Sequence, residues 1–99
     1  MFRGTTPTLN FKLPFAASTV VDGYVSIAQN RQVIVDKPIA DWAISDNTIS
    51  VTLTQKETLL LGASNTTEIQ LRVKLADGTA LASKIFTVST ERILRDGVI

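Results

Sequence analysis

Any catalytic chemistry in this chain would depend on carboxylates, hydroxyls and amines, because the sequence contains neither histidine nor cysteine. Their absence removes the usual general base near neutral pH, thiolate chemistry and the two commonest ligands of zinc. Among the acidic residues, Asp22, Asp46 and Asp77 occur in turn signals, where aspartate commonly hydrogen-bonds the local main chain. A paired-carboxylate hydrolase would need two acidic side chains to converge, and nothing in their spacing predicts this. We therefore expect that the protein is not an enzyme and has no catalytic residues.

Metal and cofactor binding have equally few signals in the sequence. Asp46-Asn47 is a pair that calcium loops use, but such a loop needs several oxygen ligands at close spacing, so we interpret the pair as a turn. The glycines are isolated and form no phosphate-binding loop. We expect neither a metal site nor a cofactor.

The charge pattern bears on the kind of partner. Ten basic and nine acidic residues leave a formal net charge of +1, with no run of Lys or Arg. Proteins that hold nucleic acid through phosphate contacts usually present a basic face, so we expect no nucleic-acid partner. The N-terminal residues lack the apolar region of a signal peptide, and no stretch approaches the ~20 apolar residues of a membrane span. We expect no signal peptide and no membrane partner.

Apolar and polar residues alternate with a period of two, which predicts strands with one buried face. In the clearest example, Ile49, Val51 and Leu53 face inward between threonine and serine residues. Six or seven short strands separated by turn signals predict a single all-β domain, residues 1–99, folded as an antiparallel β-sandwich. The predicted strands are 8–13, 24–29, 32–36, 42–44, 48–54, 68–75 and 79–90.

Two turn signals divide the first half of the chain. Residues 16–22 are expected to form a connection that ends in a turn at Asp22-Gly23. Asn30-Arg31 is expected to be the turn of a hairpin between strands 24–29 and 32–36.

One helical signal is present. Thr54 and Glu57 have the spacing of a capping box, in which the two residues satisfy each other's main-chain N–H groups. Three leucines follow, and Gly62 stops the segment. We predict one or two helical turns near 55–61.

The Asp77-Gly78 turn admits two registers for the last hairpin. A tight two-residue turn would place Val73 across from Ala82 and would direct Lys84 to the core. A longer turn with a glycine bulge would place Val73 across from Leu81 instead. The longer turn keeps the lysine out of the core, so it gives the better register.

The bulged register also determines the outward face of this hairpin. It pairs Ile69 with Ile85 and leaves Phe86 and Val88 outside. Clustered large apolar residues are seldom left bare, so either the chain's own ends cover this pair or the pair belongs to a subunit interface. The C-terminal tail allows the same two interpretations, because apolar chain ends are usually tied down. Its apolar residues are Ile93, Leu94, Val98 and Ile99.

The aromatic residues raise an alternative function, because many sandwich modules stack sugars on exposed rings. Trp42 and Tyr24 would form the stacking surface of such a carbohydrate-binding module. This requires both rings to be exposed and coplanar on one face. Tryptophan is strongly buried on average, so a core position is the competing interpretation of Trp42.

Short segments along almost the whole chain share one resemblance. They are Arg3-Gly4-Thr5-Thr6-Pro7-Thr8, 47–55 with 57–59, 69–73, Asp77-Gly78, 81–83 and Arg92-Ile93-Leu94. Together these segments resemble small proteins from prophage tail regions of Gram-positive bacteria. The chain is also similar to the N-terminal domain of siphophage upper baseplate proteins, which has an immunoglobulin-like sandwich.

The resemblance implies an immunoglobulin-like fold and a non-enzymatic phage structural protein, made in the bacterial cytoplasm and located in the virion tail. Its partners would be other tail or baseplate proteins, with a homo-oligomer as a further expected outcome. The family supplies no catalytic residues to carry over. The chain lacks the long C-terminal extension of a full baseplate protein, so we expect an adaptor or scaffold rather than a receptor-binding protein.

Overall fold

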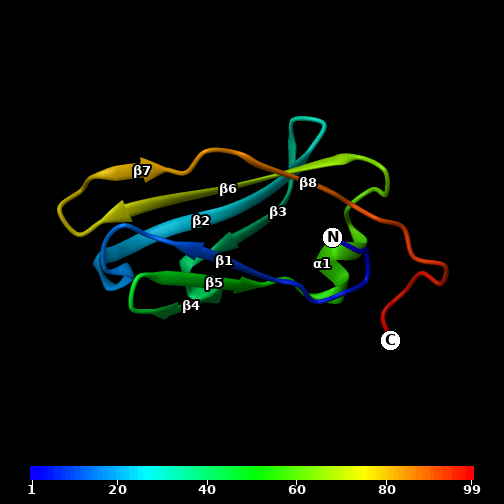
Figure 1. Ribbon diagram of the computed structural model, residues 1–99, viewed down its shortest axis with the longest axis horizontal. Helices are drawn as coiled ribbons and strands as arrows, with labels where there is room; N and C mark the ends of the chain where they lie inside the picture. Colours follow the sequence, from blue (N-terminus) through cyan, green and yellow to red (C-terminus); the bar gives the residue numbers. More distant parts are fainter.

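Eight strands form two antiparallel sheets in the computed structural model, which describes residues 1–99 (Figure 1). The smaller sheet has the order β1-β5-β4, and the larger has the order β3-β2-β6-β7, with β8 also paired to β6. The two sheets pack as a sandwich, which confirms the predicted all-β fold and is consistent with an immunoglobulin-like outline. The elements are β1 Thr8–Lys12, η1 Ala17–Thr19, β2 Val20–Gln29, β3 Gln32–Pro38, η2 Ile39–Asp41, β4 Trp42–Ser45, β5 Thr48–Thr52, α1 Gln55–Leu59, β6 Thr66–Leu75, β7 Ala80–Ala82 and β8 Phe86–Ser89.

The core lies between the sheets and consists of the inward residues of their central strands. Val25 and Ile27 of β2 are completely buried against Ile49, Val51 and Leu53. The predicted inward face of residues 49, 51 and 53 is therefore confirmed, since residues two apart on a strand share a face. Burying one such side chain stabilises the fold by about 1.5–3 kcal/mol, so these strands hold the sandwich together.

The hairpin of β2 and β3 has the two-residue turn that the sequence predicted. Asn30 and Arg31 have φ angles of 53° and 62°, so both are left-handed. Two such residues give the turn a twist that matches the twist of the flanking strands. Gln29 and Gln32 close the hairpin as a pair.

The prediction of a turn at Asp22-Gly23 was wrong, and the connection predicted over 16–22 ends earlier than expected. Both residues lie inside β2, which begins at Val20, and the short helix η1 lies between β1 and β2. Glycine is required at this strand position by close packing rather than by a turn. A Cβ at Gly23 would lie 2.5 Å from the Arg72 carbonyl oxygen and 2.6 Å from the Trp42 ring.

The last hairpin follows the bulged register only in its first part. Val73 pairs with Leu81, as predicted. The return segment then breaks after Ala82 into two strands, so that Ile69 pairs with Phe86 and not with Ile85. One extra residue is therefore accommodated between β7 and β8, and such a shift moves every later side chain to the opposite face.

Ser83 stabilises this irregular segment. Its main-chain N–H donates to the Leu71 carbonyl oxygen at 2.8 Å, and its Oγ accepts the Leu71 N–H at 3.0 Å. Its carbonyl oxygen accepts a hydrogen bond from the Gln70 side chain at 2.9 Å. The hydroxyl takes the place of a main-chain acceptor, so Leu71 stays satisfied where the ladder shifts.

A buried polar network joins the sheet to the segment after α1. Gln29 is 5% exposed, and its Oε1 accepts the Gly62 N–H at 2.7 Å while its Nε2 donates to the Gly62 carbonyl oxygen at 2.9 Å. The same Nε2 also donates to the hydroxyl of Thr67, which is hydrogen-bonded to Thr90. One side chain thus satisfies both main-chain groups of the partly buried Gly62.

Replacing Gln29→Ala is expected to lower the free energy of unfolding by about 1–3 kcal/mol, because the buried hydroxyl of Thr67 and the partly buried main-chain groups of Gly62 lose their partner. Gln32→Ala is the matched control, since Gln32 is the exposed partner of Gln29 in the hairpin and should change stability by less than about 0.5 kcal/mol. Urea unfolding followed by circular dichroism measures both variants. Equal losses in the two would contradict the assigned role of the network.

Candidate functional site

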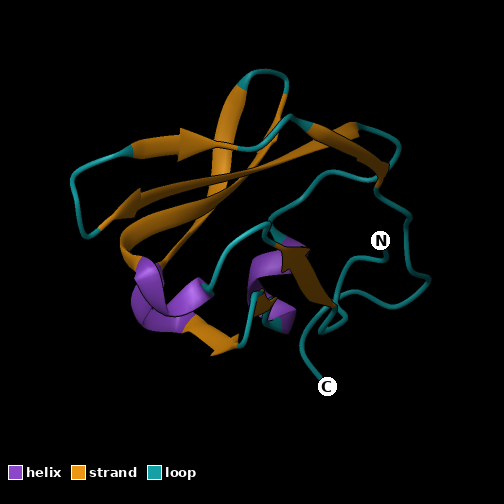
Figure 2. Cartoon of the chain, turned by 60° about the vertical axis from the view of Figure 1, so that its left-hand side comes forward, coloured by secondary structure: helices purple, strands orange, loops and turns teal.

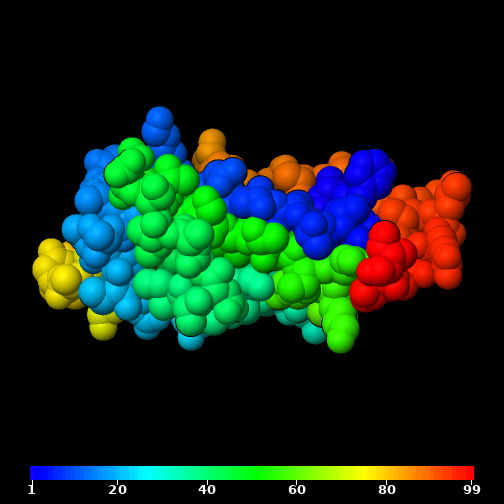
Figure 3. Space-filling model, turned by 90° about the horizontal axis from the view of Figure 1, so that it is seen from below, coloured from blue at the N-terminus to red at the C-terminus, as the bar shows by residue number.

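One long side of the sandwich is open. On the opposite side, η2 carries the chain from β3 directly into β4 and so joins the two sheets. On the open side, β1 pairs only with β5, and β7 and β8 pair only with β6, so both sheets end in edge strands there. Figure 3 shows the first residues, in blue, next to the orange segment of β7 and β8 along this side.

The space between these edges is an apolar groove, which we call the edge groove. It consists of two hollows of about 290 Å³ and about 260 Å³, and residues of β1 line both of them. Leu81 and Phe86 line it and are 41% and 40% exposed. The lining residues are Lys12, Leu13, Pro14, Phe15, Leu71, Val73, Leu81, Ala82 and Ser83 in one hollow, and Thr8, Leu9, Asn10, Phe11, Ile69 and Phe86 in the other.

Phe86 and Val88 were predicted on the outward face of the hairpin, and this placement was wrong. The shift near Ser83 directs them inward, because Phe86 lies opposite Ile69 and Val88 lies opposite Thr67. Val88 packs against the core. Phe86 reaches the edge groove, where its ring centroid is 6.3 Å from that of Phe11.

Ile85 takes the outward position that was predicted for Phe86. It is 52% exposed and lines a shallow hollow with Val33 of the neighbouring hairpin. Lys84 is exposed and so stays out of the core, although the register that predicted this ends at Ala82; its Nζ lies 5.5 Å from the centre of the Phe86 ring. The edge groove therefore has a cation at this end as well as at Lys12.

The two chain ends lie at the same end of the molecule, near α1 (Figures 1 and 2). The N-terminal arm, residues 1–7, runs along the segment after β8. The Glu91 N–H donates to the Met1 carbonyl oxygen at 2.7 Å, and the Arg3 N–H donates to the Glu91 carbonyl oxygen at 3.1 Å. The N-terminal amine also donates to the Ser89 carbonyl oxygen. The arm therefore covers the end of β8 through main-chain bonds, whereas Phe86 remains 40% exposed.

Arg3 links this arm to α1 and to the tail. Its guanidinium donates to the carbonyl oxygens of Leu59 and Leu61 at 3.0 and 2.8 Å, and to the Asp96 carboxylate at 2.7 Å. The carbonyls that end a helix have no partner within it, and a cation there is favourable. One side chain thus closes the end of α1 and holds the tail.

The predicted tail residues divide into one packed and three exposed side chains. Ile93 is half-buried and lies against Gly4, where an added Cβ would be 2.9 Å from its Cδ1. Leu94, Val98 and Ile99 are 93%, 55% and 95% exposed. The main chain of Ile99 is nevertheless fixed, because the Gln55 side chain accepts its N–H and donates to its carbonyl oxygen.

Trp42 and Tyr24 do not share a face. The indole of Trp42 is half-buried over Gly23 on the inner side of β2, and its N–H donates to the Lys37 carbonyl oxygen at 3.0 Å. Tyr24 is the next residue along β2, so its side chain points to the outer side, where it is 47% exposed. The two rings therefore form no common stacking surface.

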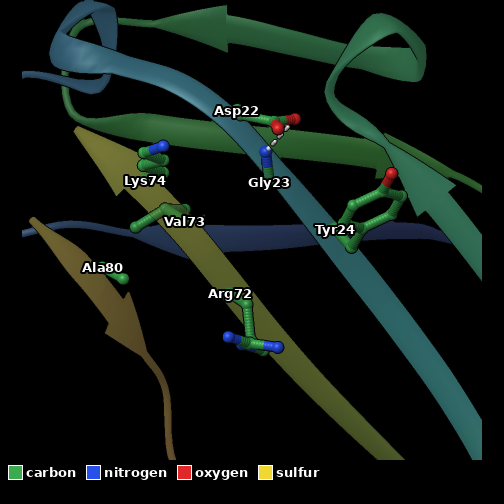
Figure 4. A pocket seen from close by; sticks show the side chains of 7 residues that line it. All are labelled: Asp22, Gly23, Tyr24, Arg72, Val73, Lys74 and Ala80. Atoms are coloured by element: carbon green, nitrogen blue, oxygen red, sulfur yellow. Dashed lines mark hydrogen bonds between the residues drawn. The ribbon is translucent and has the colours of Figure 1, made fainter. Parts of the chain in front are cut away.

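Tyr24 borders a shallow hollow of about 200 Å³ on the outer face of the larger sheet (Figure 4). Arg72 and Lys74 project into the same area from β6, and the Asp22 carboxylate accepts the N–H of Gly23 at 2.8 Å. The two cations and the phenol can donate hydrogen bonds to a polar ligand. Sequence reasoning missed this cluster, because the predicted turn at Asp22-Gly23 took Asp22 out of the strand that pairs with Lys74.

Comparisons with known proteins add no family to these observations. No protein-family model, no curated protein and no solved structure matches the chain. None of the helices has the length and hydropathy that crossing a membrane requires. Nowhere do three or more acidic side chains gather in an arrangement that could hold a metal ion.

The N-terminus of α1 is fixed by the predicted capping box and by an ion pair. The Thr54 hydroxyl accepts the Glu57 N–H at 3.1 Å, and the Glu57 carboxylate accepts the Thr54 N–H at 2.8 Å. Lys37, which is buried on the inner face of β3, donates to the same carboxylate at 2.9 Å. Burial acts to raise the pKa of Glu57, but the bonds from Thr54 and Lys37, with the lysine charge, outweigh it and hold the pKa below 4.5.

Folding stability is expected to fall as the pH drops below about 4.5, because the unfolded chain then binds a proton at Glu57 before the folded chain does. The contribution is fully present above the unfolded pKa and is lost as the pH falls through the folded one. Glu57→Gln should therefore destabilise the protein more at about pH 7 than at about pH 3. Urea unfolding at both pH values measures this, with Glu68→Gln as control, and a pH-independent loss in Glu57→Gln would contradict the ion-pair assignment.

Proposed function

We propose that this protein is a non-enzymatic structural component of a phage or prophage tail, acting as an adaptor or scaffold that packs against other tail or baseplate subunits. The sequence supports this through its resemblance to small proteins of prophage tail regions. The structure contributes two apolar surfaces, the edge groove and the C-terminal tail of the chain, residues 93–99. The virion tail is the location that follows from this role.

The observation that carries the proposal is the conformation of the chain's own C-terminal tail. Gln55 and Arg3 fix the tail main chain to α1 and to the N-terminal arm, yet the side chains of Leu94 and Ile99 stand almost fully in solvent. Apolar side chains on a segment whose only need was cover would fold onto their own domain, because burying them stabilises the fold. A held main chain with outward apolar side chains suits packing against a second protein, which is another tail subunit or a second copy.

A carbohydrate-binding module is the alternative function. It would have to rely on Tyr24 alone, because the Trp42 ring contacts Gly23 and its N–H is bonded within the chain. Arg72 and Lys74 beside Tyr24 could supply polar contacts to a sugar. A single exposed ring offers a sugar a smaller stacking area than the two rings that the sequence suggested.

Acrylamide quenching of the single tryptophan tests the form of that alternative in which both Trp42 and Tyr24 contact the sugar. The half-buried indole should be quenched about two- to fourfold less efficiently than free tryptophan, because the sandwich shields one of its faces. Adding oligosaccharides should leave its emission unchanged. Free access of acrylamide combined with a sugar-dependent change in emission would favour the carbohydrate module over the adaptor.

Light scattering behind a sizing column tests the adaptor role on the full chain and on a chain cut after Arg92. The full chain is expected to form oligomers or to bind co-expressed tail proteins, and the shortened chain should lose at least about tenfold in affinity as apolar contact area is removed. Truncation also removes Asp96, the partner of Arg3. The double variant Leu94→Ser/Ile99→Ser therefore tests the side chains alone.

Val21→Ser/Val33→Ser is the matched control, since these valines are 54% and 55% exposed but lie on β2 and β3, whereas the C-terminal tail is held by Gln55 of α1 and by Arg3. It should keep the assembly of the full chain. A chain that stays monomeric at high concentration and binds no tail protein would overturn the proposed function.

A further inference from the structure

The edge of β1 that faces the groove offers unpaired main-chain groups. The Leu13 N–H donates to the Asn47 carbonyl oxygen at 2.7 Å, and the Leu53 N–H donates to the Pro7 carbonyl oxygen at 2.9 Å. In an antiparallel pair, hydrogen-bonded positions alternate with positions whose N–H and C=O point the other way. The odd-numbered residues of β1 therefore bond to β5, and Thr8, Asn10 and Lys12 direct theirs toward the groove.

Nothing in the chain pairs with this edge. The smaller sheet ends at β1, and across the groove the larger sheet ends at β7 and β8. Natural edge strands are usually blocked by short length, a proline, a charged side chain such as lysine, or a covering segment. β1 is short, but its only charged residue is Lys12 at its last position, and the two prolines that flank it, Pro7 and Pro14, lie outside the strand. The main-chain groups of Thr8 and Asn10 are therefore left open.

The groove also has the floor that an added strand needs. Leu9 and Phe11 point inward from β1, and Ile69 and Phe86 contribute from the larger sheet. A strand laid beside β1 would direct every second side chain onto this floor and the others to solvent. Main-chain bonds along the edge with apolar pockets at alternate residues are the features by which sheets bind extended peptides.

We propose that the edge groove binds an extended segment of a partner protein, which adds a fourth strand to the smaller sheet beside β1. Its alternate side chains are apolar and fill the space between Phe11, Phe86 and Leu81. Its outward side chains include acidic ones, because the charged side chains at the groove are Lys12 and Lys84, and no acidic residue lines it.

The charges favour a different protein over a second copy of this chain. The one charged residue of β1 is Lys12, so a second β1 in the groove would bring only another lysine. The chain's own tail is held at α1 by Gln55 and Arg3. The inference rests on the proposed packing role, but it assigns a surface separate from the tail.

Amide hydrogen exchange of the full chain tests this, with a capped peptide of about eight residues that alternates valine or isoleucine with glutamate as the probe. Binding should slow exchange at Thr8, Asn10 and Lys12 by at least about tenfold, because their N–H groups gain acceptors. Exchange at Leu9 and Phe11 should change little, since these amides already bond to β5. A peptide of the same composition with its apolar residues grouped in one half should bind at least about tenfold more weakly.

Two variants of adjacent residues separate the two faces of the larger sheet. Phe86→Glu places a negative charge in the groove and should weaken peptide binding at least about tenfold. Ile85→Glu is the matched control, because Ile85 is similarly exposed but faces outward, and it should bind within about twofold of the parent. Asn10→Pro removes one outward N–H and should also weaken binding, with circular dichroism confirming that each variant is folded.

Each remaining result overturns the proposal. Absence of binding at roughly 1 mM peptide, or equal binding of the grouped peptide, would show that the edge accepts no strand. Protection of the same three amides in the free protein, with dimers that increase with concentration, would assign the edge to a second copy. Phe86→Glu should leave intact the assembly that depends on the C-terminal tail of the chain. Failure of this inference is therefore distinguishable from failure of the adaptor role.

Discussion

The fold depends on packing a wide sheet against a narrow one. Strands lie about 4.8 Å apart, so the four strand positions of the larger sheet span roughly 14 Å and the three of the smaller sheet span roughly 10 Å. On the β3 side, η2 joins the sheets and Trp42 packs over Gly23. The difference in width therefore lies entirely on the β7–β8 side, where the smaller sheet is about one strand narrower than the larger one. This constraint explains why the apolar groove exists and why its width suits a strand.

The irregularity at Ser83 determines what fills the floor of that groove. A regular return strand would have sent Ile85 inward and left Phe86 outside, whereas the extra residue reverses them. The reversal brings Phe86 toward Phe11, which lies on the other side of the edge groove. Hydrogen bonds exchanged between Ser83 and Leu71 hold the irregularity in place, so the exposed ring is a fixed feature of the sheet.

Sequence patterns predicted the sandwich, the Asn30-Arg31 turn and the capping box of α1, because each depends on residues close together in the chain. They failed at Asp22-Gly23, where the glycine is required by a ring and a carbonyl from distant strands. They also failed at Phe86, since the position of a bulge depends on the partner strand and on one serine hydroxyl. The unequal width of the sheets was likewise hidden, because alternation reveals which face of a strand is buried but not which strands are neighbours.

The two apolar surfaces offer different chemistry at different places on a molecule that is 46 Å long. The tail has its main chain bonded to Gln55 and offers only side chains, which suits a partner with a complementary apolar pocket. The edge groove offers main-chain groups as well, which require an extended partner with alternating side chains. Occupying one surface need not block the other, because α1 and the N-terminal arm hold the tail independently of β1. A small sandwich with two such surfaces can connect two different neighbours, which is the geometric requirement for an adaptor.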